Sequence, residues 1–413
     1  MSTNLLTSPI HGIVYQRDNT NRALVPVIGT AIGASSVTVS ITAQDGTKTS
    51  LTNKIPVSPN GSYSGSISVP GGWYSMNVEA NNGQKANQVE RFGVGEVFVK
   101  FGHSFMSGGF DQNRQLTAND ERVRTLTDDL KQRNYEYGKL TNVIGPFNGQ
   151  PDAWGQFGDL LVNRLNVPVL IYGCAYGGSS LAMNLDVIAN RPLSKLPPGY
   201  NGPESRQPFA PLETTLTNYV PKTGIRAILV EHGYNDRGTS QESFLAQLKQ
   251  FFTYVRETWK MPSLPVVLVQ EQLTAVQGSL YDIPTAKAQQ EFIANFPAVW
   301  KGPDFNKPSW NAIFALNDHL YGTAIDLFAK EWNESLTDSF FKDSTPYPAL
   351  NLPVNVSNTA TANAPALSSF QFIDYAIFAL TGILLVLVVT YKSRKLGIGF
   401  LLLGLLFLYR FIR

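Results

Sequence analysis

The sequence predicts an α/β protein, in which a three-layer α/β/α domain with a parallel sheet is preceded by a small antiparallel β-sandwich and followed by a C-terminal transmembrane segment. Three observations support this prediction. Short segments of alternating polarity fill the first 90 residues. From residue 94 strands alternate with longer helical stretches, and an uncharged apolar run lies near the C-terminus.

The composition of the 413 residues excludes several classes of protein. Hydrophobic residues make up 43% of the chain, which is enough for a large buried core. Lys and Arg number 33 against 31 Asp and Glu, so no excess of positive charge is present to hold a nucleic acid. A single cysteine, Cys174, cannot form an internal disulfide, and the four histidines stand singly. We therefore expect no structural metal site and no cofactor.

Residues 1–92 are expected to form the sandwich. Apolar and polar residues alternate in five segments, as in strands with one face on a core and the other in water: 13–16, 25–30, 36–43, 62–69 and 73–80. Turn signals such as Asn60-Gly61 and Gly71-Gly72 separate them. This pattern predicts a sandwich of Ig-like or jelly-roll type.

Residues 93–341 are expected to form the three-layer domain. Near-continuous apolar runs predict buried strands at 94–102, 167–173, 225–233 and 265–273. Amphipathic stretches predict helices at 153–165, 240–259, 285–296 and 322–341. Strands and helices in alternation predict a doubly wound parallel sheet that is covered on both faces.

Four loops at predicted strand ends carry the residues suited to chemistry, because ligands of open parallel sheets bind beyond the carboxyl ends of the strands. Ser104 lies on a glycine-flanked turn, where a hydroxyl is exposed; taken alone it is more typical of a helix N-cap. Gly177 and Gly178 let backbone N–H groups approach a reacting oxygen. The Asn235 side chain offers another donor, and His319 offers a general base.

Taken in order, these residues resemble the SGNH/GDSL hydrolases, and most of all the sialate O-acetylesterase-like carbohydrate esterases. The first block of those esterases is of the type G-Q-S-N-M, and residues 102–106 read GHSFM. The resemblance covers roughly residues 12–341 and includes a β-domain that leads directly into the catalytic strand. It implies an acyl-serine mechanism on short acyl esters of carbohydrate, most plausibly O-acetyl groups, with Ser104 as nucleophile and His319 as base. It also implies an oxyanion hole made of three donors: the Ser104 N–H, an N–H of Gly177 or Gly178, and the Asn235 side chain.

The chain departs from that family at its catalytic acid. The family has Asp three residues before the catalytic histidine, and here that position is Leu316, which cannot orient an imidazole. Asp318 is our candidate for the third member, although neighbouring side chains usually diverge. Asn317 or a backbone carbonyl would instead leave a Ser-His dyad. A catalytically degenerate glycan-binding or scaffold protein, and an O-acyltransferase, are the alternatives.

Further residues are candidates for substrate contact. His103 and Phe105 replace the Gln and Asn that flank the family's serine, so a substrate contact is lost or replaced there. Tyr176, Tyr234 and Trp154 carry aromatic faces that can stack on a sugar ring, and packing in the core is the competing interpretation.

The C-terminal region is expected to hold the protein at a membrane. Residues 342–369 read as a linker rich in Pro, Asn, Ser, Thr and Ala, and residues 370–413 as an anchor of one helix or a helical hairpin. Residues 370–391 contain one charge, Asp374, and span about 33 Å as a helix, close to the thickness of a bilayer core. The second run, 396–409, reaches about 21 Å.

The side of the membrane stays open. The basic cluster 392–395 favours a cytoplasmic position for that loop and hence an outside position for the enzyme, whereas the first residues lack the pattern of an export signal.

We predict that the full-length protein needs detergent for extraction and that a chain ending at Pro365 is soluble without it, because only the longer chain carries residues 370–413. Fractionation of cells that express the two forms measures this. Full-length protein in the soluble fraction without detergent would contradict the membrane anchor.

Overall fold

The computed structural model describes residues 4–44, 50–108, 111, 117–127, 136–147, 150–193, 195–270, 283–307, 310 and 319–350. The predicted anchor at 370–413, and the linker from residue 351 on, lie outside the described residues. Among the helices within these ranges, none combines the length and the apolar character that a membrane crossing requires.

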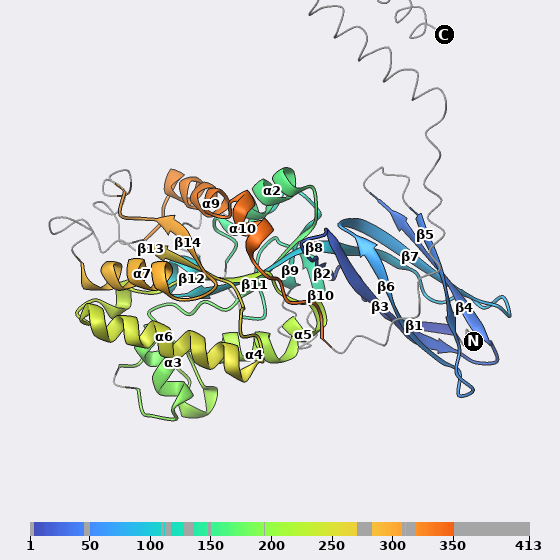
Figure 1. The fold of residues 1–413 in the computed structure, drawn as a ribbon, viewed down its shortest axis with the longest axis horizontal. Coiled ribbons are helices and arrows are strands. Elements are labelled where there is room, and N and C mark those ends of the chain that lie inside the picture. The colour runs from blue at the N-terminus through green and yellow to red at the C-terminus, as the bar shows by residue number, and fades with distance from the viewer. Residues whose placement is uncertain are drawn as a thin grey trace, which may run out of the picture. The chain divides into compact units, whose positions relative to one another are not determined.

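The N-terminal part is a β-sandwich of two sheets (Figure 1). One sheet holds β1 (Asn4–Ser8), β3 (Arg22–Ala31) and β6 (Ser62–Pro70). The other holds β2 (Val14–Gln16), β4 (Ser36–Ala43), β5 (Ser50–Pro56), β7 (Gly72–Ala80) and the first half of β8 (Val89–Gly102). All five predicted strands are present, and β1 and β5 are additional. Strand β5 escapes prediction because Ile55 is its one buried residue, so its apolar pattern is faint.

Strand β8 belongs to both parts of the molecule. Between Val89 and Gly95 it pairs with β7 and β2 of the sandwich. From Glu96 to Gly102 it pairs in parallel with β11 and β12 of the second sheet. One continuous strand of 14 residues therefore leaves the sandwich and becomes the central strand of the α/β part.

The α/β part is built on a sheet with the strand order β10-β9-β11-β8-β12-β13-β14. Its further strands are β9 (Val123–Thr127), β10 (Glu136–Lys139), β11 (Val169–Gly173), β12 (Ala227–Glu231), β13 (Val266–Gln270) and β14 (Val299–Asp304). The pairings are parallel apart from β10, which lies antiparallel to β9 at one edge. The predicted parallel sheet is thus confirmed, with an antiparallel edge strand that the sequence did not reveal.

Helices cover both faces of this sheet (Figure 1). One face packs against α3 (Leu181–Ile188), α4 (Ala210–Asn218), α6 (Gln241–Thr258) and α7 (Pro284–Asn295). The other packs against α2 (Trp154–Leu165) and α9 (Thr323–Ser335). The short helices are α1 (Ser104–Ser107), α5 (Val220–Thr223) and α10 (Asp338–Asp343). Strand β8 shows the alternation, since Val99 and Phe101 belong to the first core and Phe98 to the second.

The C-terminal end of the described chain differs from the prediction in two ways. The single helix expected at 322–341 is broken into α9 and α10, because the Thr337 side chain accepts a hydrogen bond from the Phe340 N–H and so starts a new helix. Residues 344–350, expected as linker, pack against the body instead. Tyr347 pairs with Ile225, and the Leu350 N–H donates to the Pro221 carbonyl.

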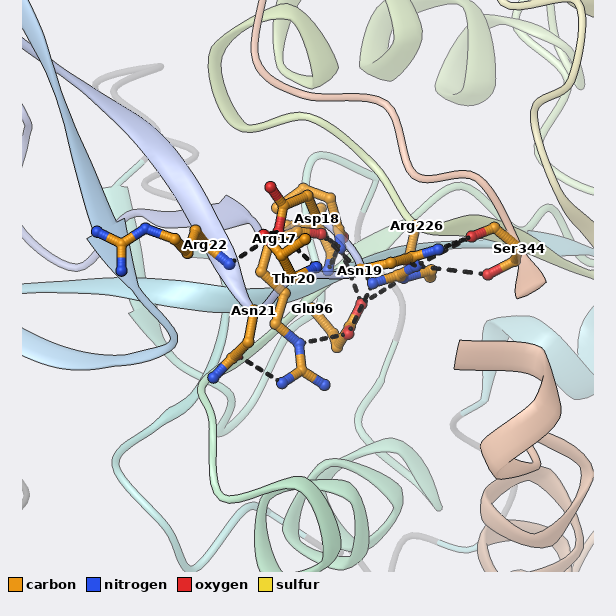
Figure 2. A network of polar contacts seen from close by, with 11 residues as sticks. Arg17, Asp18, Asn19, Thr20, Asn21, Arg22, Glu96, Arg226 and Ser344 are labelled. Atoms are coloured by element: carbon orange, nitrogen blue, oxygen red, sulfur yellow. Dashed lines mark hydrogen bonds and ion pairs between the residues drawn. The ribbon is translucent and has the colours of Figure 1, made fainter. Parts of the chain in front are cut away.

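A buried ion cluster lies where β8 passes from one sheet to the other (Figure 2). The Glu96 carboxylate is fully buried and accepts from Arg226 Nε at 2.8 Å and from Arg17 Nε at 2.8 Å. Gln16 Nε2 donates to it as well, at 2.9 Å. Arg226 extends the cluster to Asn19 Oδ1 at 2.7 Å. Two guanidinium groups thus contact one carboxylate. Arg226 directly precedes β12 of the α/β part, and Arg17 directly follows β2 of the sandwich.

We predict that Arg226→Met lowers the free energy of unfolding by about 3 kcal/mol, because Glu96 keeps a buried charge and loses its best-buried partner. Arg191→Met is the matched control: Arg191 pairs with Asp186 but is 56% exposed, and we expect a loss under about 1 kcal/mol. Chemical denaturation of both variants measures this. Equal losses in the two would show that the buried cluster adds no stability of its own.

Candidate active site

The turn that carries Ser104 follows directly from the end of β8. At Gly102 a Cβ would come within 2.3 Å of the Glu231 carbonyl oxygen, so the two strand ends approach too closely for a side chain. The His103 N–H donates to that same carbonyl at 3.3 Å, and its Nδ1 accepts from the Phe105 N–H at 3.4 Å. His103 therefore caps α1, and Ser104 becomes its first residue. The first N–H groups of a helix, here including that of Ser104, have no acceptor within the helix.

Ser104 and His319 meet at this turn although 215 residues separate them along the chain. Ser104 Oγ lies 3.1 Å from His319 Nε2, and both residues are partly exposed. The imidazole also stands edge-on to the Phe105 ring, with 5.7 Å between the ring centroids. This arrangement lets a neutral imidazole accept the serine proton while the hydroxyl oxygen attacks a bound carbonyl.

The turn with Gly177 and Gly178 and the loop with Asn235 are the two expected sources of further N–H donors. They are hydrogen-bonded to each other, and the turn is also hydrogen-bonded to β8. In the turn from Tyr176 to Ser179, Gly178 has φ 72°, and a Cβ there would come within 2.6 Å of Pro198. A Cβ on Gly177 would meet nothing within 4 Å, and the residue is partly exposed. The Tyr176 N–H donates to the Gly102 carbonyl at 2.9 Å, which holds this turn beside the nucleophile turn.

Asn235 lies in the loop after β12 and donates from Nδ2 to the Ser179 carbonyl at 2.9 Å. An amide nitrogen carries two hydrogens, so one remains for another acceptor. The next residue, Asp236, was not singled out by the sequence. Its buried Oδ1 accepts from the Leu181 N–H at 2.9 Å and from the Ala182 N–H at 3.3 Å, so it caps α3. These bonds fix the Asn235 loop to the glycine turn.

Three of the four proposed substrate contacts are too buried for that role. Trp154 is 1% exposed, because it packs in the core between Phe157, Phe328 and Trp332. His103 is fully buried, since its ring caps α1. Tyr176 is 6% exposed and stacks on Phe147 at 5.3 Å, and burial raises its pKa. Their burial therefore argues against the predicted contact with a substrate.

Tyr234 keeps its place at the site. It is half-buried, and its ring lies 6.1 Å from the His103 ring and 6.4 Å from the Phe105 ring, measured between centroids. The guanidinium of the exposed Arg237 lies over the Tyr234 ring, with its Cζ 4.3 Å from the ring centroid.

Two other reactive groups close by are held in inert forms. Burial, together with the nearby His103, lowers the pKa of His232 well below its ordinary value, so its imidazole stays neutral. Burial raises the pKa of Cys174 to about 12, and its thiol contacts Thr215 Oγ1 at 3.0 Å. Cys174 is therefore a buried thiol and no competing nucleophile.

The three residues considered for orienting His319, namely Leu316, Asn317 and Asp318, lie outside the described residues. The structure does show what holds the segment after the histidine. Asp111 Oδ2 accepts from the Gly322 N–H at 3.0 Å, three residues beyond His319. No sequence pattern pointed to Asp111, because the contact joins two loops 211 residues apart. Within the described ranges, no cluster of His, Cys, Asp and Glu could hold a metal ion.

Comparisons with known proteins give structural likenesses only. No protein-family model matches the chain, and no curated protein sequence matches it significantly. A carbohydrate acetylesterase from Xanthomonas citri is similar, with 19% identity, a TM-score of 0.43, and coverage of 76% of this chain and 74% of that one.

A protein from Arabidopsis thaliana is 18% identical with a TM-score of 0.38, covering 60% of this chain and 98% of that one. The lipase/acylhydrolase from Enterococcus faecalis is 12% identical with a TM-score of 0.31, covering 58% of this chain and 95% of that one. All three TM-scores lie below 0.5, so the activity proposed for this chain rests on its own residues.

Proposed function

We propose that the protein is a serine esterase that hydrolyses short acyl esters on carbohydrate, with O-acetyl groups as the preferred substrates. The observation that carries the proposal is the contact of Ser104 Oγ with His319 Nε2 at 3.1 Å, between partly exposed side chains at the end of the central strand. The carbohydrate part is supported by the resemblance of residues 102–106 to the sialate O-acetylesterase-like enzymes.

In the proposed mechanism, Ser104 Oγ attacks the ester carbonyl carbon while its proton passes to His319 Nε2. Negative charge then develops on the carbonyl oxygen, and N–H groups placed at that oxygen stabilise it. The donors offered are the Ser104 N–H, an N–H of Gly177 or Gly178, and the second hydrogen of Asn235 Nδ2. Collapse releases the sugar hydroxyl, which takes the proton from His319 and leaves an acyl-Ser104 ester.

A water molecule then attacks the acyl-Ser104 carbonyl carbon while His319 takes a proton from that water. The carboxylic acid leaves, and His319 returns the proton to the Ser104 oxygen. A sugar hydroxyl in place of that water would make the protein an O-acyltransferase. Product analysis in the presence of added sugar separates the two outcomes.

We expect the purified protein to hydrolyse p-nitrophenyl acetate, and Ser104→Ala and His319→Ala to lower kcat by roughly a thousandfold or more, because each removes one half of the nucleophile and base pair. Ser339→Ala and His11→Ala, at exposed positions, are the matched controls.

Equal rates for the wild type and Ser104→Ala would remove the enzyme proposal. They would favour the alternative that Leu316 suggests, a protein that keeps the fold without catalysis.

We predict that Asp318→Ala lowers kcat by roughly a hundredfold or more, because a carboxylate that orients the imidazole also stabilises its protonated form. Asp111→Ala should have a smaller effect, since its Oδ2 accepts from the Gly322 N–H and so holds the segment that follows the histidine. Steady-state kinetics of both variants tests this order. An Asp318→Ala enzyme with unchanged kcat would leave the Ser-His dyad as the mechanism.

A further inference from the structure

We propose that Lys100 is a positioning residue of this site: its amino group holds the C-terminal end of α1 in place, and thereby keeps Ser104 within reach of His319. The inference rests on the proposed esterase activity. Neither the motifs of the chain nor the mechanism above assigns any role to this lysine.

Lys100 stands in an unusual place for a charged residue. It lies on β8 four residues before Ser104, and its side chain is fully buried. On a strand, side chains alternate between faces, so Lys100 points away from the face of Val99 and Phe101 and into the core beneath α2. Burying an amino group in such a core is unfavourable unless it finds partners, so its contacts indicate what it stabilises.

Those contacts are at the end of the nucleophile helix. Lys100 Nζ donates to the Met106 carbonyl and, at 3.3 Å, to the Ser107 carbonyl. Helix α1 has four residues, and the last carbonyl groups of a helix find no donor within it. Lys100 supplies donors from below, and the Gln150 N–H supplies another to the Ser107 carbonyl at 3.1 Å.

The surroundings of the amino group complete the arrangement. Its Nζ lies 5.4 Å from the centroid of the Trp154 ring, a cation–π contact. The buried Asp152 carboxylate lies close to Gly108, the residue that ends α1, since a Cβ on Gly108 would come within 3.1 Å of Asp152 Oδ2. A cation, an anion and a ring thus enclose the end of α1.

Burial and neighbouring charges have opposite effects on the pKa of the Lys100 amino group. Burial lowers the pKa of Lys100 to about 7, while the charges of Asp152 and Cys174 act in the opposite direction. Cys174 contributes little near neutral pH, because burial keeps it as a thiol. The neutral amine keeps two N–H donors, so the hydrogen bonds persist on deprotonation, although bonds from a charged donor are about twice as strong.

The helix that carries Ser104 is therefore fixed at both ends. His103 holds its beginning through the Glu231 carbonyl and the Phe105 N–H, and Lys100 holds its end through two carbonyls. A displacement of about 1 Å in a reacting group can reduce a rate about a hundredfold. Loss of the lysine should accordingly slow the chemical step and leave substrate binding intact.

The test compares Lys100→Met with Val267→Ala, a truncation in the same core on β13, two strands away from β8. Both variants are assayed with p-nitrophenyl acetate and with a fluorophosphonate that labels the active serine, and unfolding is measured alongside. We expect Lys100→Met to lower kcat at least tenfold with KM unchanged, and to slow the labelling by the same factor. Val267→Ala should lose stability and keep kcat within twofold.

Wild-type kcat and labelling rate in Lys100→Met would overturn the inference, as would an equal loss of kcat in Val267→Ala. If Lys100→Met fails to fold, Lys100→Leu decides the question, because it also removes both hydrogen bonds to the end of α1: a fall in kcat at constant KM supports the role and an unchanged kcat refutes it. Failure of the esterase proposal looks different, since the wild type would then neither turn over nor label at Ser104.

Discussion

The shared strand β8 is the constraint on which the rest of the structure depends. Its first half is hydrogen-bonded into the sandwich and its second half is the centre of the parallel sheet, so one strand fixes two β-systems at once. At the point of transfer Glu96 is fully buried and is neutralised by Arg17 from the sandwich side and Arg226 from the sheet side. A lone buried carboxylate would be strongly unfavourable, so the two parts supply its partners jointly. The strand then ends at Gly102, where the chemistry begins.

Around that end the polar side chains mostly support other groups and do not face a ligand. His103 caps the nucleophile helix, Asp236 caps α3, and Asn235 ties its loop to the glycine turn. Such bonds matter because catalysis by hydrogen-bond donors depends on their being held in place before the charge develops. Ser104 and His319 are partly exposed, as are Gly177, Gly178, Tyr234 and Asn235.

Much of the fold could be predicted from the sequence, because burial leaves a periodic trace. The alternation in 36–43 and 73–80 and the continuous apolar run in 94–102 gave strands that the structure contains. Strands β10 and β14 left no such trace: the first has one buried residue, and the second carries Pro303 and a lysine. The break between α9 and α10 was hidden because Thr337 acts through a local hydrogen bond that apolar periodicity does not report.

By itself, the sequence determined which residues carry suitable chemistry and that they follow strand ends, since both are local properties. Only the tertiary structure decided which of them meet. It brought His319 to Ser104 across 215 residues, and it buried the side chains of Trp154 and His103. It also brought Lys100 to the end of α1 and Asp111 to Gly322, contacts that no motif suggested. The physical reason is that exposure and distance between remote residues are set by how layers pack, and a linear pattern records the face of an element but not its neighbours.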